Sequence, residues 1–328
     1  MSVVGTTHID KFLTNLSIKK TSAETMTLIA GKVCPRIPVM KSSDKYPIYG
    51  EEYKKKHDLR KTDRTPSRML TRSMSEDNYI CQDYGAKVRV TKKDMKNFDT
   101  PLDAKIDGTE FVTETMQMNE EQRVAAKFGD SDNYAGSNVV TLSGTDQWDD
   151  YNNSTPIADV VAAKIQVKKS GVAANTVIIP YDTAVVLANH PNYLAKVSDR
   201  LNTIEGLKGN AWTSGSGLLP KLEGLNVIVP SGVVDEAADG DAVSNADVWD
   251  GVWVGYINPK AQMGLKDKSF AACFAHNVDD DGNKGVRRVY KQAINKVDIH
   301  GVDINVEEST DEKIIAADLG YLIKDVIS

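Results

Sequence analysis

Apolar side chains recur at helical spacing between residues 101 and 128, and Gly129 follows them. The apolar stripe contains Ile106, Val112, Met116, Val124 and Phe128, while Glu110, Glu114, Glu120 and Glu121 are placed on polar faces. Gly108 is the one residue that disagrees with a helix. At ~1.5 Å per residue, this segment predicts a rod of roughly 38 Å.

The start of this helix is marked by Thr100-Pro101-Leu102-Asp103. Thr100 supplies a capping hydroxyl, Pro101 suits the first helical position, and Asp103 adds negative charge near the helix start. The pattern therefore predicts a single long helix over residues 101–128.

The residues before this helix have the pattern of extended chain. Pro35, Pro38 and Pro47 favour strands and disfavour helix, and residues 1–30 are typical of a flexible arm with a short helix near Ser22 to Ile29. Residues 50–75 are almost wholly polar, which is typical of a long protruding hairpin or a mobile loop. A returning strand is expected over residues 79–90. Long arms of this kind normally bury themselves against other copies of the chain.

Strands and helices alternate after the long helix. We expect a short strand leading to a turn over 139–148, a helix from Ile157 to Lys169 closed by Ser170-Gly171, a buried strand over 175–180, and a helix from Tyr181 to Asn189 stopped by His190-Pro191. A glycine-rich stretch, Trp212 to Gly217, precedes further strands at 225–229, 248–256 and 270–275. Alternation over residues 285–306 predicts long antiparallel strands. The fold class is α+β.

The charge of the chain is unevenly distributed. Residues 41–72 hold ten basic and five acidic residues, although the net charge is -6. Residues 298–328 hold eight acidic residues and two lysines, so a basic arm and an acidic tail suit head-to-tail contact between copies. Solvated surface and nucleic-acid binding are the alternatives. The candidate contact residues are Lys54, Lys55, Lys56, Arg60, Arg64 and Arg68.

Composition describes an ordinary globular protein: 328 residues, 41% hydrophobic and 26% charged, with a mean hydropathy of -0.37. The apolar runs are too short to cross a bilayer, and the first thirty residues lack the pattern of a signal peptide. Cys34, Cys81 and Cys273 are widely separated, which indicates neither a disulfide framework nor a zinc site. A reducing cytoplasm fits this cysteine usage.

Known catalytic and metal-binding patterns do not match the chain. The five histidines, His8, His57, His190, His276 and His300, lack zinc-protease spacing, and His190 suits packing at a helix end better than base chemistry. Residues 205–209 lack P-loop spacing, and residues 214–217 lack the context of a nucleophile elbow. Asp279 to Asn283 resembles part of a calcium loop without its final glutamate. We expect no catalytic residue, metal or cofactor.

Three local patterns and the order of elements resemble the major capsid proteins of tailed bacteriophages, which have the Hong Kong 97-like fold. The patterns are Ile37 to Tyr46 entering the loop, Leu142 to Trp148 after the long helix, and Asn189-His190-Pro191 after an apolar helix. The resemblance implies an N-terminal arm (1–40), an extended loop (41–80), a peripheral domain (81–155) with its spine helix (101–128), an axial domain (156–274), and a return to the peripheral sheet with a C-terminal segment (275–328).

This resemblance implies a structural protein that self-assembles into an icosahedral shell around a double-stranded DNA phage genome. Copies would form hexamers and pentamers, and scaffolding, portal and decoration proteins would be further partners. DNA would be held by non-specific contact, and no membrane would be involved. The chain would reside in the virion capsid after assembly in the host cytoplasm. An encapsulin-like nanocompartment shell and a soluble α/β enzyme are the alternatives.

Overall fold

The computed structural model describes residues 8–9, 28–49, 52–61, 66–97, 103–203, 218–237, 242–258, 268–276, 287–296 and 299–328. The predictions for most of the N-terminal arm, for Thr100 to Leu102, for Trp212 to Gly217 and for Asp279 to Asn283 lie outside these residues. Within the described part of the chain, no helix is long and apolar enough to cross a membrane.

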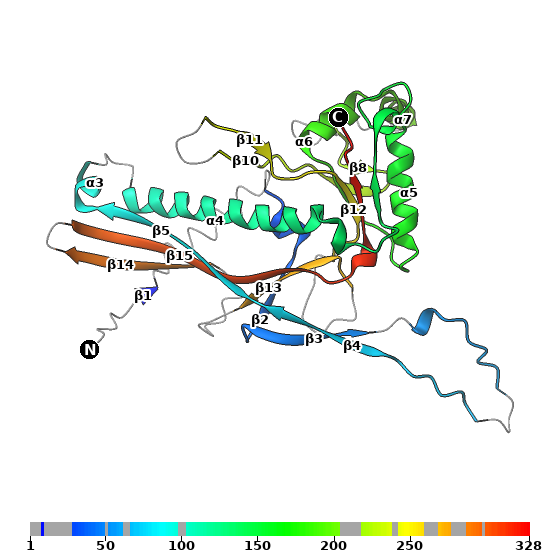
Figure 1. The fold of residues 1–328 in the computed structure, drawn as a ribbon, viewed down its shortest axis with the longest axis horizontal. Coiled ribbons are helices and arrows are strands. Elements are labelled where there is room, and N and C mark those ends of the chain that lie inside the picture. Colours follow the sequence, from blue (N-terminus) through cyan, green and yellow to red (C-terminus); the bar gives the residue numbers. More distant parts are fainter. Residues whose placement is uncertain are drawn as a thin grey trace.

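The first sheet is organised around one long strand, β15 (Figure 1). β14 and then β13 pair antiparallel along one edge of β15, and β5 pairs antiparallel along the other. β2 extends the sheet parallel to β13, and β1 pairs with β14. The strands are β1 (His8–Ile9), β2 (Arg36–Val39), β5 (Gln82–Thr91), β13 (Ala271–His276), β14 (Arg288–Lys296) and β15 (Ile299–Ile314). The predicted long antiparallel strands are thus confirmed.

The long helix, α4 (Ala104–Gly129), lies along this sheet (Figure 1). Its 26 residues match the predicted length, and Val112, Met116, Val124 and Phe128 are buried as the stripe predicted. The cap is Asp103, whose side chain accepts a hydrogen bond from the Lys105 N–H. The aspartate thus supplies the capping acceptor at the point where α4 begins, and the expected cap at Thr100 lies outside the described residues.

Two further features of α4 differ from the pattern. Gly108 is buried, and a Cβ there would lie 3.0 Å from Val88 and 3.4 Å from Val90, so the glycine lets the helix approach β5 closely. The expectation that Glu120 and Glu121 face solvent was wrong: both are buried. Polar side chains of this kind are buried only when partners satisfy them, and helical periodicity cannot reveal such partners.

A two-stranded hairpin leaves the first sheet beside β5. β3 (Ser43–Tyr49) pairs antiparallel with β4 (Met74–Ile80), and only Cys81 separates β4 from β5. The chain between them, which includes η1 (Glu52–Lys54), projects away from the body of the molecule (Figure 1). The predicted protruding hairpin is confirmed, and we call residues 52–73 the loop tip.

The second sheet has the strand order β6-β16-β12-β7-β9-β8, with helices beside it (Figure 1). Its buried strand β7 and the helices α5 and α6 confirm the predicted alternation. The strands are β6 (Val139–Thr141), β7 (Thr176–Ile178), β8 (Lys221–Leu222), β9 (Leu225–Ile228), β12 (Val252–Gly255) and β16 (Gly320–Lys324). The helices are α5 (Pro156–Lys168), α6 (Tyr181–Asn189) and α7 (Pro191–Thr203).

Shorter elements complete the described chain. They are α2 (Ala30–Val33), α3 (Lys92–Asn97), η2 (Ser131–Asn133), η3 (Gly144–Asp146), η4 (Ala317–Leu319), and a separate hairpin of β10 (Val233–Asp235) and β11 (Asn245–Asp247). Within residues 275–328, the strands of the first sheet end at Ile314. The last strand, β16, pairs with β6 and β12 and belongs to the second sheet. β13, in turn, starts in the first sheet at Ala271, before the expected boundary at 274.

An aromatic cluster joins the two sheets at the end of α4. Phe128 packs edge-on against Trp249, Trp253 and Phe270, with ring centroids 5.1 to 5.5 Å apart. These residues belong to one buried core that also includes Ile29 and Val33 of the N-terminal part. The end of the long helix is therefore held against both sheets by apolar burial.

Candidate inter-subunit surface

The loop tip is carried on a firmly anchored base. Tyr79 stacks on Phe274 of β13 with centroids 4.6 Å apart, and Tyr46 lies 5.3 Å from the same ring. The Tyr46 hydroxyl donates to Asp77 at 2.7 Å, and the Asp311 carboxylate accepts from the Ile80 N–H at 2.9 Å. Apolar burial and hydrogen bonds thus fix the direction in which the hairpin leaves the sheet.

The predicted basic residues divide into two groups in the structure. Lys55, Lys56, Arg60 and Arg68 are exposed on the loop tip, and Arg64 lies outside the described residues. Lys54 is different: its Nζ donates to the Ser170 carbonyl at the end of α5, and its side chain lies over Gly171. A cation is favourable at the carbonyl end of a helix. Lys54 therefore holds the loop tip to its own chain, whereas the other four described residues remain available for contact.

Apolar side chains share the loop tip with these cations. Leu59, Met69 and Leu70 are 63%, 87% and 54% exposed. With Lys55, Arg68 and Arg72 they line a hollow of about 690 Å³. Sequence reasoning missed this surface because it described residues 50–75 as polar; the adjacent Met69 and Leu70 were the available signal. A surface that is both basic and apolar suits contact with another protein.

Three carboxylates of the acidic tail are engaged within their own chain. Asp303 forms an ion pair with Arg89 at 2.8 Å, Glu308 pairs with Arg287 at 2.8 Å, and Glu312 pairs with Arg123 at 2.9 Å. These three carboxylates are therefore not available to the basic arm of another copy, whereas Glu307 and Asp325 of the tail are exposed. Glu308 and Glu312 lie on the face of β15 toward α4, where they are buried and require arginine partners from their own chain.

Three arginines and three glutamates form a buried network between α4 and the sheet. Glu120 accepts from Arg36 at 2.6 Å and from Arg287 at 2.7 Å. Burial alone would raise the pKa of Glu120, but the two guanidinium groups bring it below its ordinary value. Burial alone would lower the pKa of Arg36. The carboxylates of Glu120 and Glu308 outweigh this effect and raise the pKa above its ordinary value. The ion pairs therefore favour the charged forms of Glu120 and Arg36, and the network contains equal numbers of acidic and basic side chains.

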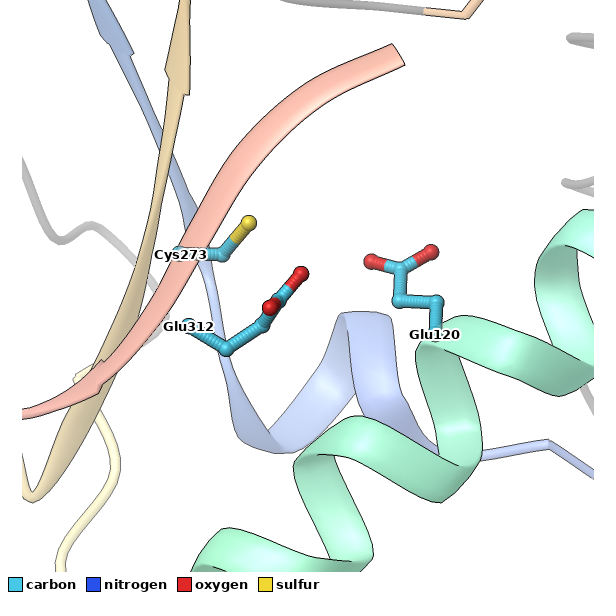
Figure 2. A group of neighbouring side chains, drawn as sticks. All are labelled: Glu120, Cys273 and Glu312. Atoms are coloured by element: carbon cyan, nitrogen blue, oxygen red, sulfur yellow. The ribbon is translucent and has the colours of Figure 1, made fainter. Parts of the chain in front are cut away.

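Glu120, Cys273 and Glu312 converge as three potential metal ligands (Figure 2). Both carboxylates are already acceptors for arginines: Glu120 for Arg36 and Arg287, and Glu312 for Arg123. Burial raises the pKa of Cys273 well above its ordinary value, which disfavours the thiolate that binds metals. The chemistry of this group is that of an internal ion-pair network, and it does not fit a metal ion.

Glu121 connects the N-terminal part of the described chain to α4. Its carboxylate accepts from the Ile29 and Ala30 N–H groups at 2.7 to 2.9 Å and from the Trp249 Nε1–H at 2.6 Å. Burial raises its pKa, although the three donors oppose this effect. These hydrogen bonds hold the start of α2 against the long helix.

The chemistry of His190 confirms packing at a helix junction. The ring is fully buried; Nδ1 accepts from the Asn192 N–H at 3.1 Å, so the proton is assigned to Nε2, which lies 3.1 Å from Ser154 Oγ. The Ser154 hydroxyl donates to the Asp150 carbonyl. Burial lowers the pKa of His190. The serine and histidine therefore join α7 to the chain before α5 and are not arranged as a nucleophile and base open to substrate.

Comparison with known proteins identifies relatives that share the fold of the whole chain. No family model matches the chain. A curated relative, the major capsid protein of Pseudomonas phage JBD67, is 25% identical over 330 residues, covering 98% of this chain and 97% of the relative. The crystal structure of a phage-related protein from Bordetella bronchiseptica RB50 matches with a TM-score of 0.69 at 19% identity, over 98% and 99% of the two chains. The chain has the capsid fold of tailed phages.

Other shells share this capsid fold. The capsid structure of cyanophage P-SCSP1u matches with a TM-score of 0.54 at 11% identity, over 89% of this chain and 86% of that chain. An encapsulin from Synechococcus elongatus PCC 7942 matches with a TM-score of 0.51 at 14% identity, over 90% and 86%. The predicted α+β fold class and the resemblance to tailed-phage major capsid proteins are confirmed. The capsid fold alone does not separate a phage shell from an encapsulin.

Proposed function

We propose that this chain is a major capsid protein that self-assembles into the icosahedral shell of a tailed, double-stranded DNA phage. The observation that carries the proposal is the similarity to a phage major capsid protein along 98% of the chain. The encapsulin shell is less supported, because the likeness to that protein is structural and its sequence identity is 14%. A soluble enzyme is disfavoured by the full-length similarity to a capsid protein.

The loop tip is the part of the subunit best suited to contact neighbours. It combines exposed cations with exposed Leu59, Met69 and Leu70, while its base is fixed on the first sheet. Obligate assemblies commonly bury about 2,000 to 5,000 Å² per interface. A projecting loop adds area that a compact subunit lacks, so many modest contacts sum to a stable shell.

The remaining assignments follow from this proposal. Residues 156–274 would form the axial domain, in which α5, α6 and α7 lie beside the second sheet, and residues 81–155 with the return strands would form the peripheral domain. Copies would associate as hexamers and pentamers, with scaffolding, portal and decoration proteins as further partners. DNA would be held by non-specific contact, since the chain is acidic overall. Assembly would take place in the host cytoplasm and yield the virion capsid.

Electron microscopy of the purified full-length chain tests the proposal. We expect closed particles, and phage-type particles recovered after DNA packaging should protect DNA from nuclease, whereas an encapsulin would hold cargo protein. A small, monodisperse species that forms no particles at any concentration would contradict the shell function.

Charge reversal tests the part assigned to the loop tip. Converting Lys55, Lys56 and Arg60 to glutamate should lower the yield of closed shells; Lys54 is left unchanged because it binds Ser170 of its own chain. The matched control reverses Lys92, Lys93 and Lys96, three exposed lysines on α3. Normal assembly of the loop variant would count against loop contacts between subunits.

A further inference from the structure

The hollow in the loop tip has the chemistry of a docking surface. Lys55, Arg68 and Arg72 line it together with Leu59, Met69 and Leu70, and Glu52 is its one acidic lining residue, so cations outnumber carboxylates there. Within the described residues, Arg68 of the hollow forms no ion pair with a carboxylate, and neither do Lys56 and Arg60, which lie on the same loop tip outside the lining. An occupant of this hollow would therefore be acidic and would also present apolar side chains.

The β10–β11 hairpin has these two properties. Residues 232–251 contain six acidic side chains and no lysine, arginine or histidine. Glu236 and Asp247 are exposed, and the hairpin also exposes Val233 and Val243, at 45% and 71%. Pairing of Val233 with Asp247 and of Asp235 with Asn245 presents these residues on a short two-stranded element. The hairpin and the loop tip thus match in charge and in apolar character.

The negative charge of the hairpin is uncompensated among the described residues. None of its described carboxylates forms an ion pair there, and Asp182 of α6 adds a further negative charge. Partial burial, and then the charge of Asp182, raise the pKa of Asp247 above its ordinary value. A cationic partner from outside the chain would relieve this repulsion.

The two surfaces cannot meet within one molecule as it is folded. Figure 1 shows the hairpin above α4 and the loop tip on the far side of the first sheet, each projecting in a different direction. Lys54 and the stacked base of the hairpin hold the loop tip in this position. The hairpin of a second copy can supply the complementary surface, and contact between two different surfaces of identical chains generates rings where the rotation between copies closes.

We propose that the hollow of the loop tip receives the β10–β11 hairpin of a neighbouring copy. The proposal rests on the assembly of this chain into shells and names the surfaces that meet there. In this contact Lys55 and Arg68 face Glu236 and Asp247, and Val243 contacts the apolar wall formed by Leu59 and Met69. The acidic partner of the loop is thus the hairpin and not the C-terminal tail.

A charge swap in the full-length chain tests this pairing. The loop variant is Lys55→Glu with Arg68→Glu, the hairpin variant is Glu236→Lys with Asp247→Lys, and the third variant carries all four changes. The control variant is Lys92→Glu with Lys93→Glu, which reverses two exposed lysines on α3. Shell yield is measured by sedimentation and electron microscopy, and thermal melting confirms that each subunit is folded.

We expect the loop variant and the hairpin variant each to lower the shell yield by about tenfold, because like charges then repel at every copy of the contact. The fourfold swap should recover the yield to within about twofold of the wild type, and the control should match the wild type. High salt should lower the wild-type yield.

Three results would separate the possible failures. If the wild type forms shells and the swap restores nothing, the hairpin is not the partner of the loop. If the loop variant forms shells at normal yield but with less protected DNA, the loop binds nucleic acid, and the pairing is again wrong. If the folded wild type forms no particles, the shell function itself fails.

Discussion

Replacement of Glu120 by glutamine tests the buried network between α4 and the first sheet. The substitution keeps the size of the side chain and removes its charge. Arg36 and Arg287 then lose the shared carboxylate charge, because both donate to the same oxygen of Glu120, at 2.6 and 2.7 Å, and an amide oxygen carries no formal charge. Arg287 is 2% exposed, so water cannot take the place of the carboxylate without a structural opening.

The size of the effect follows from burial. Removing one partner of a buried ion pair typically costs about 3–5 kcal/mol, because the remaining charge is left uncompensated. Glu308 still pairs with Arg287 at 2.8 Å and offsets part of the loss. We therefore expect a decrease of about 3 kcal/mol in the free energy of unfolding, at the lower end of that range.

Urea unfolding of the subunit, followed by tryptophan fluorescence, measures this loss. The matched control is Glu76→Gln, since Glu76 pairs with Lys45 at 3.1 Å but both side chains are exposed. The control should unfold almost as the wild type does, because exposed ion pairs contribute little. Acid provides a second measurement: the pKa of Glu120 is lower in the folded state, so its contribution is present above pH 4.5 and is lost as the pH falls through the folded pKa.

A loss below about 1 kcal/mol for Glu120→Gln would refute this reasoning, since that is the cost of an exposed pair. The variant lacks the carboxyl group of Glu120, so its free energy of unfolding should fall less than that of the wild type between pH 5 and pH 3. An equal fall in both proteins would also refute the reasoning.

Three further predictions concern other contacts of the subunit. Glu121→Gln should destabilise the subunit by about 1–3 kcal/mol and increase proteolysis near α2, because one amide oxygen cannot accept from Ile29, Ala30 and Trp249 together; unchanged proteolysis would contradict this. Burial lowers the pKa of His190 in the folded chain, so the unfolded chain binds the proton first and the wild type loses stability as the pH falls below 6.5. His190→Gln should reduce this loss. An equal decrease in the free energy of unfolding of wild type and variant between pH 7 and pH 5 would contradict this. Gly301→Ala should lower the melting temperature, with a cost of about 1–3 kcal/mol, because its Cβ would contact the Val90 backbone; Gly129→Ala, with open space around it, is the control.

Local rules predicted most elements of the fold. The apolar stripe identified α4, the prolines identified the extended segments, and alternation identified β14 and β15. The helix α7 was missed because His190-Pro191 indicated a stop, whereas Pro191 is also suited to the first position of a new helix. β16 was missed because its membership of the second sheet depends on pairing with distant β6 and β12.

The candidate surface was predictable in part. The excess of lysine and arginine located the loop tip, but spacing could not show that Lys54 is bound to Ser170. The acidic residues of β15 were counted as a free tail because net charge does not distinguish exposed from buried carboxylates. Their arginine partners lie up to 272 residues away along the chain, as for Arg36 and Glu308. Pairing over such distances is a property of the fold and not of any local pattern.

The buried network also connects the loop to the long helix. Tyr79 at the loop base stacks on Phe274 of β13, and the neighbouring strand β2 carries Arg36, which pairs with Glu120 of α4. The loop base is therefore linked through packed rings, a strand pairing and an ion pair to α4, the longest helix among the described residues. Glu120→Gln should weaken this path as well as the subunit, whereas reversal of exposed loop charges should weaken assembly and leave the melting temperature unchanged. The two classes of variant therefore distinguish the strength of the subunit from the strength of its contacts.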